Sequence, residues 1–419
     1  MKDKVALFQR MSKIIIKNIK GLVQAGENIP VLLKGPEMAN LRIINNAYLA
    51  IEDGCVIDYG SMDEWQGITD WRGVEVLDAE GCFVLPALID SHTHAVFSSY
   101  RETEFVDRIK GLTYEEIALR GGGILNSAKK LADATEDELF KEAKERVHRM
   151  IAIGTGALEI KSGYGLTTLN EIKMLRVIKR LKAYFTIPIK ATFLGAHAFP
   201  LEYKSDQEGY VSMIIDEMIP QIATEGLADF IDVFCERNYF SVDQMQRLLI
   251  AGKAAGLTPK VHVNQFSVLG GVKAAVDLGA LSVDHLEELS EEDLLSLNSS
   301  NCVATLLPSC SFFLGIPFGD ARRLIDANIP VCLASDYNPG SSPSYNLFFV
   351  WSLACVKMKM TPEEAFNALS INAAYALGLA ESHGKIKLGY RGKLILTRPI
   401  PSFDYLPYAF AENNIARIF

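Results

Sequence analysis

The stretch Leu85-Pro86-Ala87-Leu88-Ile89-Asp90-Ser91-His92-Thr93-His94 is an apolar run that ends in two histidines separated by one residue. We predict a buried strand over residues 84–90, with both imidazoles leaving the sheet edge toward one cation. A His-x-His pair alone is weak evidence, because two exposed or capping histidines give the same pattern. The metal interpretation is strengthened by His197, His262 and His285, since each lies at or near the end of a similar apolar run.

The composition excludes several classes of protein. The chain has 419 residues, 49% of them hydrophobic and 22% charged, which is enough for a large barrel and a smaller module. A net charge of −9 without a long block of one sign gives no basic surface for nucleic acid or an anionic membrane. The seven scattered cysteines suit a reducing compartment, and we see neither a secretory leader nor a long apolar run. We expect a cytoplasmic protein with a small-molecule partner.

Short strand-like runs occupy both ends of the chain. Turn residues such as Glu52-Asp53-Gly54 separate the first runs, as hairpins require. We predict one small domain resembling a β-sandwich, built from residues 12–81 and 384–419. The expected strands cover residues 14–16, 47–51, 56–60, 74–78, 385–386, 393–396 and 415–418.

Between residues 82 and 383 apolar runs alternate with long amphipathic segments, which predicts a parallel (β/α)8 barrel, or TIM barrel. A doubly wound open sheet is the alternative. Gly121-Gly122-Gly123 lacks the spacing and the preceding strand of a dinucleotide-binding turn, which disfavours that alternative. The expected strands are 84–90, 155–161, 189–196, 230–235, 260–265, 282–287, 303–308 and 331–336, and the expected helices are 135–153, 169–184, 211–225, 242–255 and 269–278.

The barrel prediction brings the candidate ligands to one place, because active sites of such barrels lie at the C-terminal ends of the strands. His92 and His94 follow the first expected strand, His262 lies in the fifth, His285 in the sixth, and Asp336 closes the eighth. Each has a structural explanation by itself, as a core histidine or a helix-capping aspartate. Together they form a nitrogen and oxygen set suited to Zn²⁺ or Fe, with a position left for water.

Longer strings of residues narrow the function further. They are Ser91-His92-Thr93-His94, Lys161-Ser162-Gly163-Tyr164-Gly165-Leu166, Leu194-Gly195-Ala196-His197-Ala198, Val283-Asp284-His285-Leu286-Glu287, Ala304-Thr305-Leu306-Leu307-Pro308 and Asp336-Tyr337-Asn338-Pro339-Gly340-Ser341. In this order they resemble the imidazolonepropionase family of the amidohydrolase superfamily of metal-dependent hydrolases, over nearly the whole chain. The resemblance implies that the ring amide of 4-imidazolone-5-propanoate is hydrolysed to N-formimidoyl-L-glutamate in histidine degradation. It also implies one zinc or iron ion per chain, with His92, His94, His262 and Asp336 as ligands.

The resemblance implies roles for the other residues of the mouth. Asp336 can take the proton of the attacking water and His285 can hydrogen-bond the aspartate or the developing oxyanion. Arg101 would clamp the substrate propionate, although a solvated arginine gives the same local pattern. The other positions implied to contact substrate are Tyr164, His197, Asn338, Gly340 and Ser341, for which packing, capping and turn formation are the structural alternatives.

Two positions bear on the choice among members of this superfamily. Two-metal amidohydrolases carry a modified lysine at the end of strand four, where this chain has Cys235-Glu236, so we predict one metal and interpret Lys161 as structural or ion-paired. Gln265 stands where superfamily deaminases, and also some imidazolonepropionases, carry a glutamate, and an amide cannot transfer protons. We therefore predict that Gln265 is a catalytic and substrate-binding residue that hydrogen-bonds the ring. A deaminase and a catalytically silent scaffold remain the alternatives, and a homodimer is the expected assembly.

Overall fold

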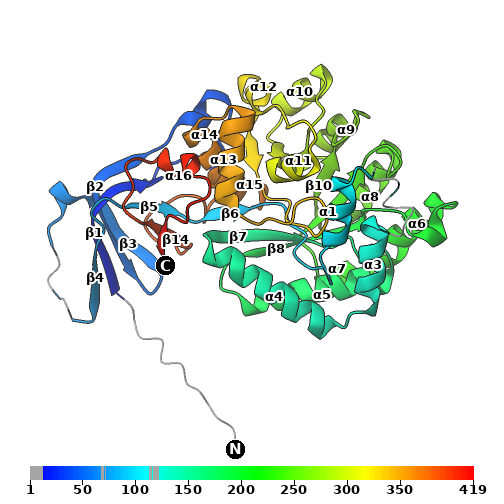
Figure 1. Cartoon of the computed structure of the whole chain (residues 1–419), viewed down its shortest axis with the longest axis horizontal. Helices are drawn as coiled ribbons and strands as arrows, with labels where there is room; N and C mark the ends of the chain where they lie inside the picture. Colours follow the sequence, from blue (N-terminus) through cyan, green and yellow to red (C-terminus); the bar gives the residue numbers. More distant parts are fainter. Residues whose placement is uncertain (1–12, 68–69, 71, 113–115, 117–121) are drawn as a thin grey trace, which may run out of the picture.

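Two β-sheets organise the molecule. The computed structural model describes residues 13–67, 70, 72–112, 116 and 122–419. One sheet has eight strands in the order β13-β12-β11-β10-β9-β8-β7-β6, and the other has seven strands drawn from both ends of the chain. In Figure 1 the seven-stranded sheet lies at the left and the eight-stranded sheet at the right, with the helices α13, α14 and α15 between and above them.

The eight-stranded sheet is a parallel barrel that closes at its mouth. Thr93, just after β6, forms a parallel bridge with Tyr337, just after β13. The backbone N–H of Asp336 donates to His92 at 3.1 Å, and that of His94 donates to Tyr337 at 2.8 Å. The predicted (β/α)8 barrel is confirmed. Its strands are β6 (Leu88–Asp90), β7 (Thr155–Lys161), β8 (Ile189–Ala196), β9 (Phe230–Cys235), β10 (Thr258–Val263), β11 (Ser282–His285), β12 (Val303–Leu306) and β13 (Val331–Leu333).

Amphipathic helices cover the outside of the barrel. Thr135 and Glu138 form a capping box that begins α4, whose buried side chains pack into the barrel core. The predicted helix over 211–225 is divided into α6, a π-helical turn (Ile214–Met218) and α7. None of the helices in the described ranges combines the length and apolar character needed to span a bilayer.

The helices that follow the strands differ in length. They are α1 (Glu102–Ile109), α3 (Gly123–Asp133), α4 (Glu136–Ala152), α5 (Thr168–Tyr184), α6 (Gln207–Met213), α7 (Ile219–Glu225), α8 (Val242–Ala254), α9 (Gly271–Asp277), α10 (Glu291–Asn298), α11 (Pro308–Leu314), α12 (Ala321–Asp326), α13 (Leu347–Met358), α14 (Pro362–Leu369), α15 (Ile371–Ala376) and α16 (Tyr405–Tyr408).

Strands from both termini make the second sheet, in the order β15-β14-β5-β1-β2-β3, with β4 paired to β1. Leu394 and Leu396 of β14 pack into its core, whereas Ile395 between them packs into the barrel core. Successive side chains of β14 therefore point into different cores, and this strand joins the two cores. The division of the chain into a barrel domain of residues 82–383 and a small domain of residues 12–81 and 384–419 stays a prediction. The strands are β1 (Lys13–Val23), β2 (Ile43–Glu52), β3 (Cys55–Ser61), β4 (Val74–Asp78), β5 (Phe83–Pro86), β14 (Leu394–Thr397) and β15 (Ile415–Ile418).

The single strand predicted over residues 84–90 is wrong, because the run contributes to both sheets. Its first part, β5, pairs antiparallel with β14, and its last part, β6, pairs parallel with β7. Between them Ala87 donates its N–H to Lys393 at 2.9 Å. Pro86 has no N–H for a further ladder bond, and the chain changes sheets directly after it. Hydrophobicity marks both parts as buried and does not distinguish the sheet in which each one lies.

Candidate metal centre and substrate cavity

Four barrel strands carry the predicted mouth residues. His92 and His94 follow β6, His262 lies one residue before the end of β10, and His285 is the last residue of β11. Asp336 lies three residues beyond β13, where the sequence predicted that it closes the strand. All five side chains are buried at the same end of the barrel.

Left-handed backbone conformations aim several of these side chains. The φ angles are 92° at His285, 60° at Leu286, 51° at Asp336 and 56° at Asn264. Such positions cost about 1–3 kcal/mol each for residues other than glycine, so the surrounding structure must hold them. Four such residues thus lie at or beside the predicted mouth residues.

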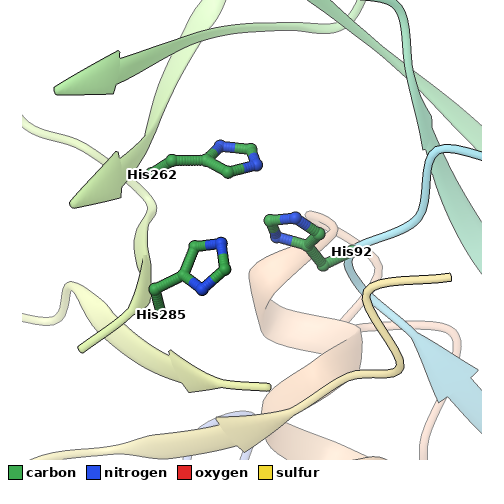
Figure 2. A group of neighbouring side chains, drawn as sticks. All are labelled: His92, His262 and His285. Atoms are coloured by element: carbon green, nitrogen blue, oxygen red, sulfur yellow. The ribbon is translucent and has the colours of Figure 1, made fainter. Parts of the chain in front are cut away.

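The histidine rings face one another around a small space (Figure 2). One ligand atom each from His92, His262 and His285 lie within 4.8 Å of one another, and the same holds for His92, His94 and Asp336. The Nε2 atoms of His92 and His94 are both 3.5 Å from Oδ1 of Asp336. The four predicted ligands thus meet around His92, and His285, predicted as a catalytic residue, lies in the same cluster.

Two of the imidazoles are oriented by buried carboxylates. Nδ1 of His92 lies 2.6 Å from Oδ2 of Asp284, and Nδ1 of His262 lies 2.9 Å from Oδ2 of Asp232. An ionised carboxylate only accepts hydrogen bonds, so it favours the tautomer with the proton on Nδ1. The opposite nitrogens, Nε2 of His92 and of His262, have no hydrogen-bond partner among the described residues.

The protonation of the histidines also fits a metal. Burial, followed by nearby positive groups such as Lys161 and His262, holds the pKa of His92 well below its ordinary value. Burial and neighbouring His197 and His262 do the same for the pKa of His94. Neutral imidazoles with buried, unpartnered nitrogens supply the lone pairs that Zn²⁺ or Fe requires.

His285 and Asp336 have a different electrostatic setting. Burial alone would lower the pKa of His285, but Glu287, Asp336 and Asp284 raise it above its ordinary value. Nδ1 of His285 lies 3.4 Å from Oε2 of Glu287. Burial raises the pKa of Asp336, and His285 and His262 partly oppose that shift. These two side chains form an adjacent pair that can hold a proton.

A cavity of about 830 Å³ opens above the cluster. His94, His262, His285 and Asp336 line its floor, while His92 lies beneath them. Every residue predicted to bind substrate also lines this cavity. These residues are Arg101, Tyr164, His197, Gln265, Asn338, Gly340 and Ser341.

Arg101 is a buried cation in the cavity wall. Its side chain is 8% exposed, and its Nη1 lies 3.8 Å from Oε2 of Glu104, beyond hydrogen-bond distance. Its Nε has no hydrogen-bond partner among the described residues. A Cβ atom at Gly340 would overlap the guanidinium, so glycine is what allows Arg101 to lie here. The arrangement leaves guanidinium hydrogen-bond capacity for an anionic ligand.

Asn338 shapes the last loop of the cavity. Its amide nitrogen donates to the carbonyl of Asp336 at 2.7 Å and to the hydroxyl of Ser341 at 2.8 Å. Its side-chain oxygen accepts from the N–H groups of Gly340 and Ser341 at 2.8 and 2.7 Å. Asn338 therefore fixes the loop that carries Gly340, and its predicted contact with substrate stays a prediction.

Tyr164 and His197 form the wall beside His94. The ring of His197 stacks on His94 with centroids 5.4 Å apart, and its Nδ1 lies 2.9 Å from the carbonyl of Gly163. Buried Glu171 accepts the N–H groups of Gly163, Gly165 and Leu166 at 3.0, 2.6 and 3.0 Å. One carboxylate thus orders the turn that carries Tyr164.

The chain is similar to named proteins over almost its whole length. An imidazolonepropionase from Flavobacterium johnsoniae is 52% identical over 401 residues, covering 96% of this chain and 97% of that protein. Another from Christiangramia forsetii is 51% identical over 406 residues, covering 97% of this chain and 98% of that protein. This chain belongs to the imidazolonepropionase family. An imidazolonepropionase from Geobacillus kaustophilus is 43% identical over 96% of both chains, and the amidohydrolase family model matches residues 246–415.

Solved structures support the same fold at low identity. A guanine deaminase from E. coli has a TM-score of 0.69 at 14% identity, covering 97% of both chains. An adenosine deaminase from Xanthomonas campestris with bound zinc has a TM-score of 0.68 at 12% identity, covering 97% of this chain and 91% of that one. At such identities the likeness concerns the barrel and its added sheet. It does not extend to the substrates of those deaminases.

Gln265 lies in the cavity of this imidazolonepropionase family member, as the sequence predicted. Its side chain is 8% exposed, and its Nε2 lies 3.7 Å from Sγ of Cys310. The amide can donate and accept hydrogen bonds but cannot carry a proton between atoms. Its position supports a binding role toward a ring, and its predicted catalytic role stays a prediction.

The sequence patterns did not predict the carboxylates that support the cluster. Asp232, Asp284 and Glu287 contact predicted ligands or His285, and Glu171 orders the Tyr164 turn. A signal for the first was present, because Asp232 is the one charged residue of the apolar strand Phe230–Cys235. Charged side chains in buried strands need partners, so they point to a polar site.

Glu171→Gln should loosen the turn that carries Tyr164 in this imidazolonepropionase family member. The amide keeps one acceptor oxygen where the carboxylate has two, and hydrogen bonds to a charged group contribute about 1.5–3 kcal/mol. Amide hydrogen exchange over residues 163–166 should therefore speed up by about tenfold or more. Glu364→Gln is the matched control, because Glu364 is a buried carboxylate that accepts from Thr361 at the start of α14. Unchanged exchange at 163–166 in the Glu171 variant would contradict this role.

Proposed function

We propose that this chain hydrolyses the ring C–N amide bond of 4-imidazolone-5-propanoate, giving N-formimidoyl-L-glutamate in histidine degradation. One observation carries the proposal: Arg101 lines the same cavity as His94, His262 and Asp336, which cluster with His92 beneath the cavity floor. The substrate has one carboxylate and one ring amide, which match these two features. The names of relatives that are 43–52% identical over nearly the whole chain support it.

The proposed ligands of the metal are His92, His94, His262 and Asp336. Their buried, unpartnered nitrogens and the adjacent carboxylate suit one zinc or iron ion per chain. A bound divalent ion would lower the pKa of a coordinated water and polarise the ring carbonyl. His285 lies within the same cluster, so it is close enough to hydrogen-bond the reacting oxygen.

Asp336 and His285 carry out proton transfer in the proposed reaction. Asp336 accepts the proton of the attacking water and passes it to the ring nitrogen that leaves. His285, held near Glu287, donates a hydrogen bond to Asp336 or to the developing oxyanion. When the C–N bond breaks, the former ring carbonyl becomes a carboxylate and the nitrogen keeps the formimidoyl group.

The cavity walls position the substrate in this proposal. Arg101 binds the propionate through its guanidinium, and Gln265 hydrogen-bonds the ring. Tyr164 and His197 pack against the ring beside His94, at centroid distances of 5.9 and 5.4 Å from that histidine. Asn338, Gly340 and Ser341 complete the wall near Arg101.

The alternatives have less support. A purine or pyrimidine deaminase must protonate a ring nitrogen and then an amine, and the neutral Gln265 leaves that sequence without the usual carrier. A silent scaffold has no need for four buried ligands and a buried arginine.

We also propose a cytoplasmic homodimer. Its seven cysteines, all in the described part of the chain and all unpaired, support the reducing compartment.

Turnover of 4-imidazolone-5-propanoate tests the proposed function. The purified protein should consume this compound, followed as the loss of its ultraviolet absorbance. It should release no ammonia from guanine, adenosine or cytosine. Ammonia release at a comparable rate would support a deaminase instead, and no reaction with any of these compounds would favour the scaffold.

Arg101→Met should raise KM about 10–150-fold, because a charge-assisted pair to a ligand carboxylate is worth about 1.5–3 kcal/mol. Gly340→Ala should raise KM in the same direction, since the added Cβ displaces the guanidinium. The double variant should be no worse than Arg101→Met alone. An additive loss in the double variant would mean that Gly340 acts independently of Arg101.

Elemental analysis should find one equivalent of zinc or iron per chain. The prediction follows from two ligand groups that share His92 among the described residues and from Cys235, not a lysine, at the end of β9. Treatment with a chelator should abolish turnover, and adding either metal back should restore it. Two tightly held equivalents per chain would contradict the one-metal site.

A further inference from the structure

Beneath the histidine cluster the barrel encloses a network of charged side chains. Lys161, Lys260, Glu159, Asp232 and Asp284 are all at most 1% exposed. They come from β7, β9, β10 and β11, so they fill the interior of the barrel from several sides. None of them is among the residues that line the substrate cavity in the described part of the chain. These side chains therefore do not contact a substrate bound in the cavity.

Lys161 is the member of the network that joins the partners of two predicted ligands. Its Nζ donates to Oδ2 of Asp232 at 2.8 Å and lies 3.7 Å from Oδ2 of Asp284. Those same oxygen atoms contact Nδ1 of His262 and Nδ1 of His92, respectively. One ammonium group is thus shared by two carboxylates that each orient one histidine. A third contact, at 2.7 Å to Glu159, anchors the ammonium from its own strand.

The remaining hydrogen bonds of both aspartates fix their direction. Oδ1 of Asp232 accepts the backbone N–H of His262 at 3.0 Å. Oδ1 of Asp284 accepts the hydroxyl of Ser282 at 2.6 Å. Each aspartate therefore has one oxygen held by its surroundings and the other shared between a histidine and Lys161. Loss of the lysine would leave that second oxygen attracted to the histidine alone.

We propose that Lys161 is a positioning residue that couples His92 and His262 through Asp284 and Asp232, so that both Nε2 atoms are held toward one metal ion. The inference rests on the proposed metal site and does not depend on the identity of the substrate. It assigns a function to a lysine that sequence analysis interpreted as structural or ion-paired. Removing a group that orients a metal ligand typically changes metal affinity 10–100-fold.

Charge balance gives the lysine a second effect. With every group in its charged form, the three carboxylates and two ammonium groups of the network carry one net negative charge. A cation in the cluster would offset this charge inside a buried region, where uncompensated charge is costly. Replacing Lys161 by a neutral residue would leave one further buried negative charge and would let the aspartates rearrange. We therefore expect the orientation of the two histidines to be lost together with the charge balance.

Lys260 provides a matched comparison within the same network. It is equally buried and forms an ion pair with Glu159. Its other hydrogen bond goes to the backbone carbonyl of Ser91 at 2.9 Å. No contact joins it to Asp232 or Asp284 among the described residues. A purely structural network would respond alike to the loss of either lysine, whereas a positioning role distinguishes them.

Zinc affinity of the apo-protein tests the inference. Lys161→Met and Lys260→Met would each be titrated with Zn²⁺ against a chromophoric chelator of known affinity, with the melting temperature of each apo-protein measured in parallel. Lys161→Met should weaken zinc binding about 10–100-fold. Lys260→Met should change it much less, even if its melting temperature falls as far. With Co²⁺ in place of zinc, the visible absorption bands should shift only in the Lys161 variant, because they report ligand geometry.

Several results would overturn the inference. Zinc binding by Lys161→Met as tight as in the wild type would do so, and so would equal weakening in both lysine variants. If Lys161→Met does not fold, Lys161→Gln replaces it, because its amide can still donate to Asp232 without a charge, and the same criteria apply. A wild-type protein that binds neither zinc nor iron would overturn both the inference and the proposed metal site. Tight zinc binding without turnover of 4-imidazolone-5-propanoate would overturn the proposed function alone.

Discussion

The need to compensate buried charge is the constraint on which this structure depends. The barrel interior holds carboxylates from three strands, and each would be costly in an apolar core without a partner. Lys161 and Lys260 supply that compensation at distances that leave no room for water. The histidines above them complete the arrangement, since Oδ2 of Asp284 and Oδ2 of Asp232 also lie 2.6 and 2.9 Å from imidazole Nδ1 atoms. Stability of the barrel and orientation of the site thus come from the same contacts.

A second constraint is the closure of the barrel at its mouth. The strand β6 is only three residues long, and its end is joined to the segment after β13 by the backbone bonds of His92, His94 and their partners. That closure brings Asp336 beside histidines that lie more than 240 residues earlier in the chain. His285 and Asp336 have left-handed backbone conformations at this same end of the barrel, so the packing around them must hold them.

The specificity features lie in loops, while the ligands come from the strand ends. Gly340 leaves room for the guanidinium of Arg101, and Glu171 orders the turn that carries Tyr164. Asn338 fixes the loop that carries Gly340 and Ser341. The same barrel in solved deaminases supports other substrates, which fits the general rule that loops vary on a constant barrel. In this family member Gln265 and the largely buried Arg101 line the cavity.

The sequence by itself determined the barrel, the composite sheet and the set of residues at the mouth. Period-two and amphipathic patterns report burial, and His92, His262 and Asp336 stand next to strand ends, where barrel sites lie. Tertiary structure alone decided that the run at 84–90 divides between two sheets, because hydrophobicity does not encode the pairing partner. It alone also decided which carboxylate orients which histidine. Asp232 and Asp284 lie on different strands from Lys161, and only the closed barrel brings their oxygens to one ammonium group.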